Sequence, residues 1–194
     1  MIKFKVVVAG AKNVGKTSLI RRYATGKFET STLSTIGVDF ETKKLVVDGT
    51  EILLNIWDFA GEKKFRLLFP SYISGASGAL LLYDITNKDS FNDLYDWINV
   101  ISSIPNSPKT KILIETKTDL KRKVAKEEAM GFVEKYDFQG DIIATSAKTG
   151  ENVEEAFITL GREILKNSLR KCTNCEKMYP IELKFCQYCG SKAS

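Results

Sequence analysis

Residues 10–17 read Gly-Ala-Lys-Asn-Val-Gly-Lys-Thr, which matches the pattern G-x-x-x-x-G-K-[ST]. A β-rich run at 3–9 precedes this loop, and a helix pattern at 17–24 follows it. The glycines let backbone N–H groups wrap a phosphate, while Lys16 neutralises phosphate charge and Thr17 offers a hydroxyl ligand to Mg²⁺. The helix N-terminus adds partial positive charge at the same place. The segment therefore predicts a phosphate-binding loop between a strand and a helix.

The rest of the chain alternates between strand and helix patterns. Extended runs at 40–47 and 51–57 flank Asp48-Gly49, a dipeptide typical of hairpin turns. Further strands are expected at 79–83, 111–114 and 142–145, and further helices at 91–104, 126–136 and 153–167. Asp89 or Ser90 is expected to cap the helix at 91–104. The alternation predicts an α/β fold with a six-stranded, mostly parallel sheet, one antiparallel edge strand and helices on both faces.

Composition excludes several other classes of protein. The chain has 194 residues, of which 43% are hydrophobic and 27% charged, with 13 Gly and 4 Pro. These values argue against collagen-like, disordered and coiled-coil proteins. The longest strongly apolar stretch, 79–83, is far shorter than the roughly 18 residues of a membrane span. No secretory signal pattern opens the chain, so we expect a cytoplasmic protein.

Positive charge is concentrated near the end of the chain. The net charge is +5, and residues 162–194 contribute +4 of it, from seven Lys or Arg and three Asp or Glu. A solvated basic end is the simplest interpretation. A membrane or nucleic-acid patch is the alternative, although the chain has no block of five like charges.

Three polar segments follow predicted strands. Asp58, in Trp57-Asp58-Phe59-Ala60-Gly61, can hold Mg²⁺ through water, and Gly61 can offer its N–H to a γ-phosphate. Thr116-Lys117-Thr118-Asp119 and Ser146-Ala147-Lys148 follow later strands, at the edge where open α/β sheets bind ligands. The Asp119 carboxylate can accept hydrogen bonds from guanine N1 and N2, which adenine cannot supply.

Together these motifs, in this order and spacing, resemble the Ras superfamily of small GTPases over residues 3–168. The segments 36–40 and 81–86 resemble those of the Rab branch most closely. The resemblance implies the G-domain form of the P-loop NTPase fold. It also implies two switches, at 30–40 and 59–76, that bind effectors, exchange factors and activating proteins.

The resemblance assigns roles residue by residue. Phe28 packs on the guanine edge, the Lys117 stem lies on the base, and the Ala147 N–H contacts guanine O6. The implied Mg²⁺ ligands are Thr17, Thr35 and, through water, Asp58. The implied catalytic set is Lys16, Thr35, Gly61 and Glu62. The implied nucleotide-binding set is Asn13, Val14, Gly15, Lys16, Thr17, Ser18, Phe28, Thr35, Gly61, Thr116, Lys117, Asp119, Leu120, Ser146, Ala147 and Lys148.

Three positions depart from the family pattern. Thr116 stands where most members have Asn, and Lys12 replaces a small residue of the phosphate-binding loop. Glu62 occupies the position of the glutamine that orients the attacking water. A carboxylate accepts a hydrogen bond from water but cannot donate one, and it brings negative charge beside phosphate. We therefore expect nucleotide binding to be retained and hydrolysis to be slow.

All four cysteines lie near the end of the chain, as Cys172-x-x-Cys175 and Cys186-x-x-Cys189. Two such pairs in a cytosolic protein are typical of a structural Zn²⁺ site, with disulfides or free thiols as alternatives. The segment resembles a zinc ribbon. We expect a G domain at 1–168 and a linker with a Cys₄ ribbon at 169–194. Five residues follow Cys189, so no C-a-a-X lipid anchor is expected.

The sequence predicts a GTP/GDP-dependent switch that uses Mg²⁺, hydrolyses GTP slowly and docks a protein partner through its zinc ribbon. Such a partner can also bring it to a membrane periphery. The alternative is a GTP-binding interaction module with negligible hydrolysis. A third interpretation, nucleic-acid binding by the ribbon, rests on the weak pattern of Lys177, Tyr179, Lys184 and Tyr188 and is not expected.

Overall fold

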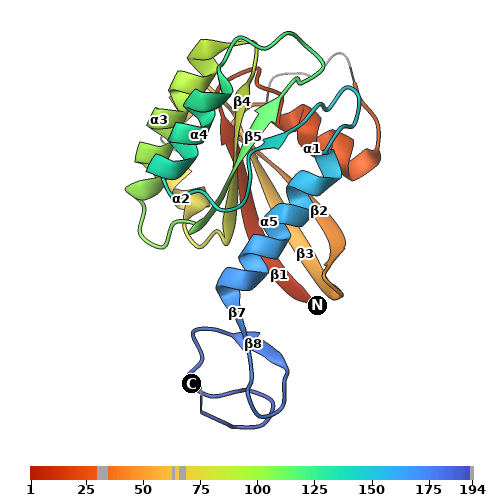
Figure 1. The fold of residues 1–194 in the computed structure, drawn as a ribbon, viewed down its shortest axis with the longest axis vertical. Coiled ribbons are helices and arrows are strands. Elements are labelled where there is room, and N and C mark those ends of the chain that lie inside the picture. Colours follow the sequence, from red (N-terminus) through yellow and green to blue (C-terminus); the bar gives the residue numbers. More distant parts are fainter. Residues whose placement is uncertain (30–34, 63, 66–68, 193–194) are drawn as a thin grey trace.

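The computed structural model describes residues 1–29, 35–62, 64–65 and 69–192. Figure 1 shows a large α/β body and a small C-terminal lobe that follows the end of helix α5 (Val153–Ser168). Parts of both expected switches, residues 30–34, 63 and 66–68, lie outside the described residues.

Six strands of the described chain form one sheet, in the order β2-β3-β1-β4-β5-β6. β2 runs antiparallel to β3, and the other pairs are parallel, which confirms the predicted fold class. The strands are β1 (Ile2–Gly10), β2 (Val38–Val47), β3 (Thr50–Phe59), β4 (Gly78–Asp84), β5 (Thr110–Thr116) and β6 (Ile143–Ala144).

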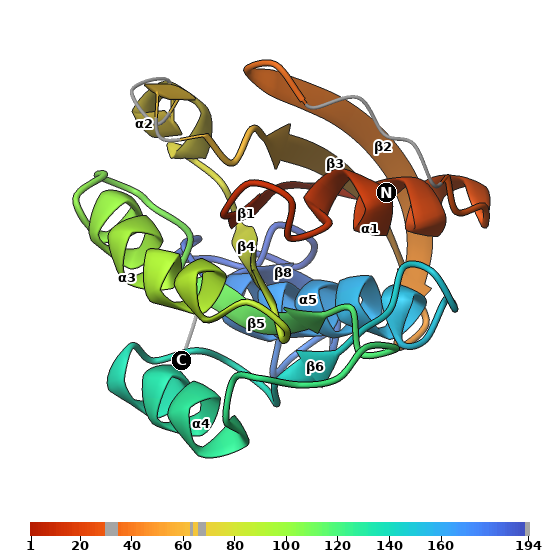
Figure 2. The ribbon, with the colours of Figure 1, turned by 90° about the horizontal axis from the view of Figure 1, so that it is seen from above.

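Helices cover both faces of this sheet (Figure 2). The helices are α1 (Lys16–Thr25), α2 (Phe69–Ile73), α3 (Lys88–Ser102), α4 (Lys126–Lys135) and α5 (Val153–Ser168). Side chains alternate across β1, so that Val7 belongs to the buried cluster that includes α2, α3 and α4 side chains, while Val6 belongs to the cluster that includes α1 and α5 side chains. Strands buried on both faces are apolar throughout, which explains the continuous run in β4.

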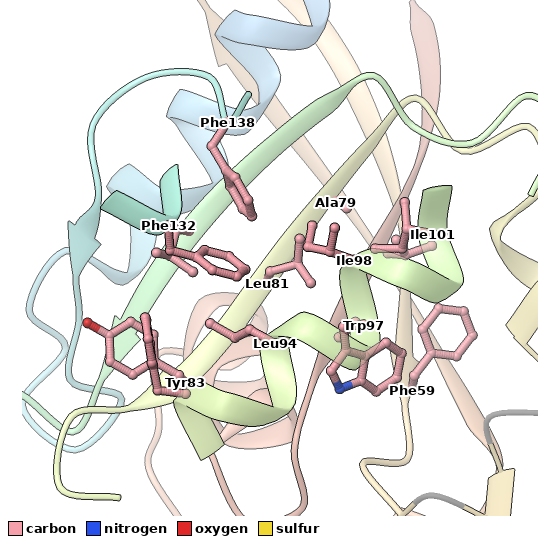
Figure 3. Close-up of a cluster of buried hydrophobic side chains, with 14 of the residues drawn as sticks. Phe59, Ala79, Leu81, Tyr83, Leu94, Trp97, Ile98, Ile101, Phe132 and Phe138 are labelled. Carbon is pink, nitrogen blue, oxygen red and sulfur yellow. The ribbon is translucent and has the colours of Figure 1, made fainter. Parts of the chain in front are cut away.

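The layer under α3 and α4 is rich in aromatic side chains (Figure 3). Trp97 of α3 stacks on Phe69 of α2 at 4.5 Å between ring centroids, and Phe132 of α4 meets Phe91 of α3 at 5.7 Å. These rings bury large apolar areas. They fix the helices against the strands whose ends carry the polar motifs.

The cap predicted for α3 and the end predicted for β5 were wrong. The cap of α3 is Asn87, whose side chain accepts from the N–H groups of Asp89 at 3.0 Å and Ser90 at 3.4 Å. The Ser90 hydroxyl instead donates to the Asn87 carbonyl at 2.7 Å. The strand expected to end at residue 114 extends to Thr116, because β5 pairs with β4 as far as Asp84.

The C-terminal lobe begins with a strand where a linker was expected. Helix α5 ends at Ser168, and β7 (Leu169–Lys171) follows directly and pairs with β8 (Met178–Pro180). Tyr179 is buried with Cys172 and Cys186 in a small separate core. The lobe lies beyond the amino-terminal end of β1, whereas the phosphate-binding loop follows the carboxyl-terminal end of that strand (Figure 1). Among the helices described, none is long and apolar enough to cross a membrane.

Candidate nucleotide and metal sites

The loop after β1 curls around the amino group of Lys16. Lys16 Nζ donates to the carbonyl oxygens of Gly10 at 2.9 Å and Ala11 at 2.7 Å. Gly15 precedes α1 with φ of 97°, a left-handed conformation that favours glycine. Glycine is also required at Gly10, where a Cβ would lie 2.3 Å from the Leu82 carbonyl oxygen. The loop therefore places a lysine and a helix N-terminus at one end of a pocket.

Oxygen atoms from three chain segments converge beside this loop. The Thr17 hydroxyl lies 2.8 Å from the Thr35 hydroxyl and donates to Asp58 Oδ2 at 2.5 Å. Asp58 is buried, and its Oδ1 has no hydrogen-bond partner among the described residues. Burial raises the pKa of Asp58, although the Thr17 hydrogen bond and the Lys16 charge oppose that rise. Two hydroxyls and a carboxylate with a free buried oxygen fit the hard oxygen ligation that Mg²⁺ requires.

Glu62 is held by two lysines at the mouth of the same pocket. Lys12 Nζ donates to Glu62 Oε1 at 2.7 Å, and Lys64 Nζ lies 2.8 Å from Oε2. The hydrogen bonds from Lys12 and Lys64 lower the pKa of Glu62 to about 2. Both carboxylate oxygens are engaged and the group is ionised at neutral pH.

The loops that follow β5 and β6 meet at the other end of the pocket. Asp119 Oδ1 accepts from the Ser146 hydroxyl at 2.6 Å, and Lys148 Nζ lies 3.9 Å from Oδ2. Lys117 Nζ forms an ion pair with Asp84 Oδ2 at 2.6 Å. Burial would raise the pKa of Asp84, but hydrogen bonds from Lys117 and Thr86 outweigh it and lower the pKa.

Thr116 connects the two ends of the pocket. Its hydroxyl lies 2.7 Å from the carbonyl oxygen of Val14 and 2.9 Å from that of Tyr83. The threonine that replaces the usual asparagine thus joins the phosphate-binding loop to the ends of β4 and β5.

A cavity of about 370 Å³ runs between these groups. It is lined by fifteen of the sixteen residues expected to bind nucleotide, the exception being Ser146, which contacts Asp119 from behind. Lys12 and Glu62 also line it. Sequence reasoning missed the lining residues Leu19, Phe59 and Thr145, as well as the partner roles of Lys64 and Asp84. Asp84 ends the apolar run of β4. A carboxylate at that strand end was the available sign that it belongs to the site.

The cysteines gather in the C-terminal lobe. The four Sγ atoms lie within 4.8 Å of one another, with Cys172 and Cys189 3.5 Å apart and Cys175 and Cys186 3.6 Å apart. A tetrahedron with Zn–S bonds of about 2.3 Å has edges of about 3.8 Å. The cluster is therefore compatible with zinc binding.

The strand–loop–helix phosphate site, at the carboxyl edge of a mostly parallel sheet, defines a P-loop α/β protein. A family model described as the Ras family matches residues 5–166, and the chain belongs to that family. Membership implies a GTP-binding switch GTPase that uses Mg²⁺.

The relatives lie in the Rab branch. The Ras-related protein Rab-8B of Homo sapiens is 40% identical over 170 residues, which cover 87% of this chain and 81% of the relative. Rab-13 of Canis lupus familiaris is 38% identical over 186 residues, covering 94% and 91%. Rab-1D of Dictyostelium discoideum is 39% identical over 183 residues, covering 93% and 88%. The predicted resemblance is thereby confirmed.

Proposed function

We propose that this chain is a guanine-nucleotide switch with slow GTP hydrolysis, and that its C-terminal zinc ribbon docks a protein partner. The observation that carries the proposal is the single pocket that joins the Lys16 loop and the oxygens of Thr17 and Asp58 to the loop of Asp119. A nucleoside polyphosphate has this layout, with charge at one end and a base at the other. We divide the chain at residue 168, where the lobe with its own small core begins.

The phosphate end acts through charge and position. When the nucleotide binds, we expect Lys16 to exchange its carbonyl partners in the loop for β- and γ-phosphate oxygens. Thr17, Thr35 and, through water, Asp58 would hold Mg²⁺, which would neutralise charge on the phosphates. Thr35 joins the first switch region to this set, which couples that region to the γ-phosphate. The Gly61 N–H is to donate to the γ-phosphate.

The base end selects guanine. Asp119 offers one oxygen beyond its Ser146 hydrogen bond and presents a carboxylate to guanine N1 and N2. Phe28 and Leu120 border the cavity with apolar surface, and the Lys117 stem and Ala147 lie along it. Because adenine carries no N1–H and no 2-amino group, it offers no base donor to the Asp119 carboxylate, and such mismatches are strongly rejected.

Slow hydrolysis follows from Glu62. Ionised between Lys12 and Lys64, the carboxylate has no proton to donate to the oxygens of the transition state. Lys12 offsets part of the negative charge, and we expect its bulk to obstruct an arginine supplied by an activating protein. We propose an intrinsic rate no faster than the roughly 10⁻⁴ s⁻¹ scale of unassisted Ras-type domains.

The ribbon has the features of a docking module. Zn²⁺ bound by four thiolates would supply the folding energy that so small a core cannot. Met178, Ile181, Leu183, Phe185 and Tyr188 leave at least 36% of their surface exposed, an unusual density of apolar side chains for a short segment. Tyr179, one of the two aromatic residues in the nucleic-acid pattern, is buried and not available for base stacking.

The chief alternative is a GTP-binding interaction module that stays loaded, and the engaged state of Glu62 favours it. Single-turnover hydrolysis of stoichiometric GTP separates the two functions. A measurable rate that is abolished by Lys16→Met supports the switch. GTP that remains intact over many hours supports the interaction module.

A further inference from the structure

An ion pair with a buried carboxylate flanks the loop that carries the base-binding residues Lys117 and Asp119. Arg122 Nη1 donates to Glu115 Oε1 at 2.8 Å, and Arg122 Nη2 donates to Oε2. The Glu115 side chain is 5% exposed and that of Arg122 is 26% exposed. The Tyr83 hydroxyl also donates to Glu115 Oε1, at 2.5 Å. A carboxylate this deeply buried is retained only with such partners.

The pair spans the segment that carries the base-binding residues. Glu115 and Arg122 are seven positions apart, and Lys117 and Asp119 lie between them. At its start this segment continues from β5, and Lys117 has a left-handed φ of 61°. At its end the Arg122 guanidinium also donates to the Val124 carbonyl at 3.3 Å. The side chains of Glu115 and Arg122 thus close the loop 116–122 across its base.

Glu115 also holds the second base-binding loop. Its backbone carbonyl accepts from the Thr145 N–H at 2.7 Å and from the Thr145 hydroxyl at 2.9 Å. Thr145 directly precedes Ser146, whose hydroxyl contacts Asp119. The Thr118 N–H in turn donates to the Thr145 carbonyl at 3.2 Å. One residue therefore anchors both loops, by its side chain on one and by its backbone on the other.

We propose that Glu115 and Arg122 are positioning residues for guanine recognition, which set the Asp119 carboxylate against the 2-amino group of the base. The inference rests on the proposed guanine-binding function of this pocket. The bidentate geometry matters because two parallel hydrogen bonds fix the orientation of the guanidinium as well as its distance. A single-point contact leaves the loop free to rotate about that contact.

The test compares the affinities of GDP and IDP for the full-length chain with Mg²⁺, by calorimetry on nucleotide-free protein. IDP lacks the 2-amino group, so the ratio of the two affinities reports the Asp119 contact and not phosphate binding. We expect Arg122→Met to lower this ratio by roughly two- to tenfold, the value of one net hydrogen bond. Lys121→Met is the matched control because it removes the same charge. Lys121 is exposed and has no ion pair with a described residue. This variant is expected to leave the ratio unchanged.

Arg122→Lys keeps the charge and loses the bidentate geometry, and we expect it to give an intermediate ratio. It also carries the test if Arg122→Met does not fold. An unchanged ratio in a folded Arg122 variant, even one with a lowered melting temperature, would show a merely structural ion pair and overturn the inference. An equal loss in Lys121→Met would overturn it too. If the unmodified protein itself binds GDP and IDP equally, the proposed contact between Asp119 and the 2-amino group fails instead.

Discussion

Replacement of Glu62 by Gln should speed single-turnover GTP hydrolysis. Lys12 and Lys64 lower the pKa of Glu62 to about 2, so at pH 7 about one molecule in 10⁵ carries the protonated, hydrogen-bond-donating form. At the ordinary pKa of 4.5, about three molecules in 10³ would carry it. Glutamine carries a donor in every molecule and removes a negative charge beside the proposed γ-phosphate position. We expect a gain of about tenfold or more, below the roughly 10²–10³-fold of a donor in a fully preorganised site.

The assay follows phosphate release from stoichiometric Mg·GTP between pH 5 and pH 8. Because the lowered pKa puts the titration of Glu62 below this window, the rate of the unmodified protein should show no inflection from Glu62 within it. Glu128→Gln is the control: Glu128 also has a pKa lowered by a lysine, Lys88, but lies on α4 away from the pocket. It should leave the rate unchanged. Slower hydrolysis in Glu62→Gln would refute the reasoning and make Glu62 a working catalytic group.

Three further predictions concern other parts of the molecule. Asp119→Asn should weaken GDP binding and favour xanthosine diphosphate, whose 2-oxo group accepts from the new amide. Competition binding between the two nucleotides checks this, and a retained preference for guanine would contradict it. Gly61→Ala places a Cβ 2.4 Å from backbone atoms of Ala11 and Lys12, so calorimetry should show GTP binding weakened by about 1–3 kcal/mol. Unchanged GTP affinity in this variant would contradict the prediction. Cys175→Ser should release one equivalent of zinc and unfold the ribbon, as followed by proton NMR, while GDP binding persists. Zinc-free wild-type protein with four reactive thiols would argue against the site.

Much of the fold was predictable because its signals are local. The loop at 10–17 and the Asp48-Gly49 turn each require particular backbone conformations, and the sequence shows the residues that adopt them. Gly49 has φ of 78° in the hairpin turn. Periodicity placed the helices, since the buried face of α3 recurs at helical spacing.

What was missed depends on contacts between distant segments. Asn87 and Ser90 are both acceptable caps, and only the backbone path after β4 decides between them. The pairing of Glu62 with Lys12 joins positions 50 residues apart. Glu115 looks like the end of a strand because it is charged, yet Arg122 and Tyr83 make its burial possible. No sequence pattern predicts such partners.

The central claim is that the pocket recognises a guanine nucleotide. It is tested most directly by titrating the nucleotide-free protein with GDP and with ADP under identical Mg²⁺ and salt conditions. Both ligands present the same diphosphate to Lys16 and Thr17, so the difference in affinity isolates the base end. GDP is expected to bind at least about 10²-fold more tightly than ADP, since adenine offers no base donor to the Asp119 carboxylate. Equal affinities for GDP and ADP would contradict it.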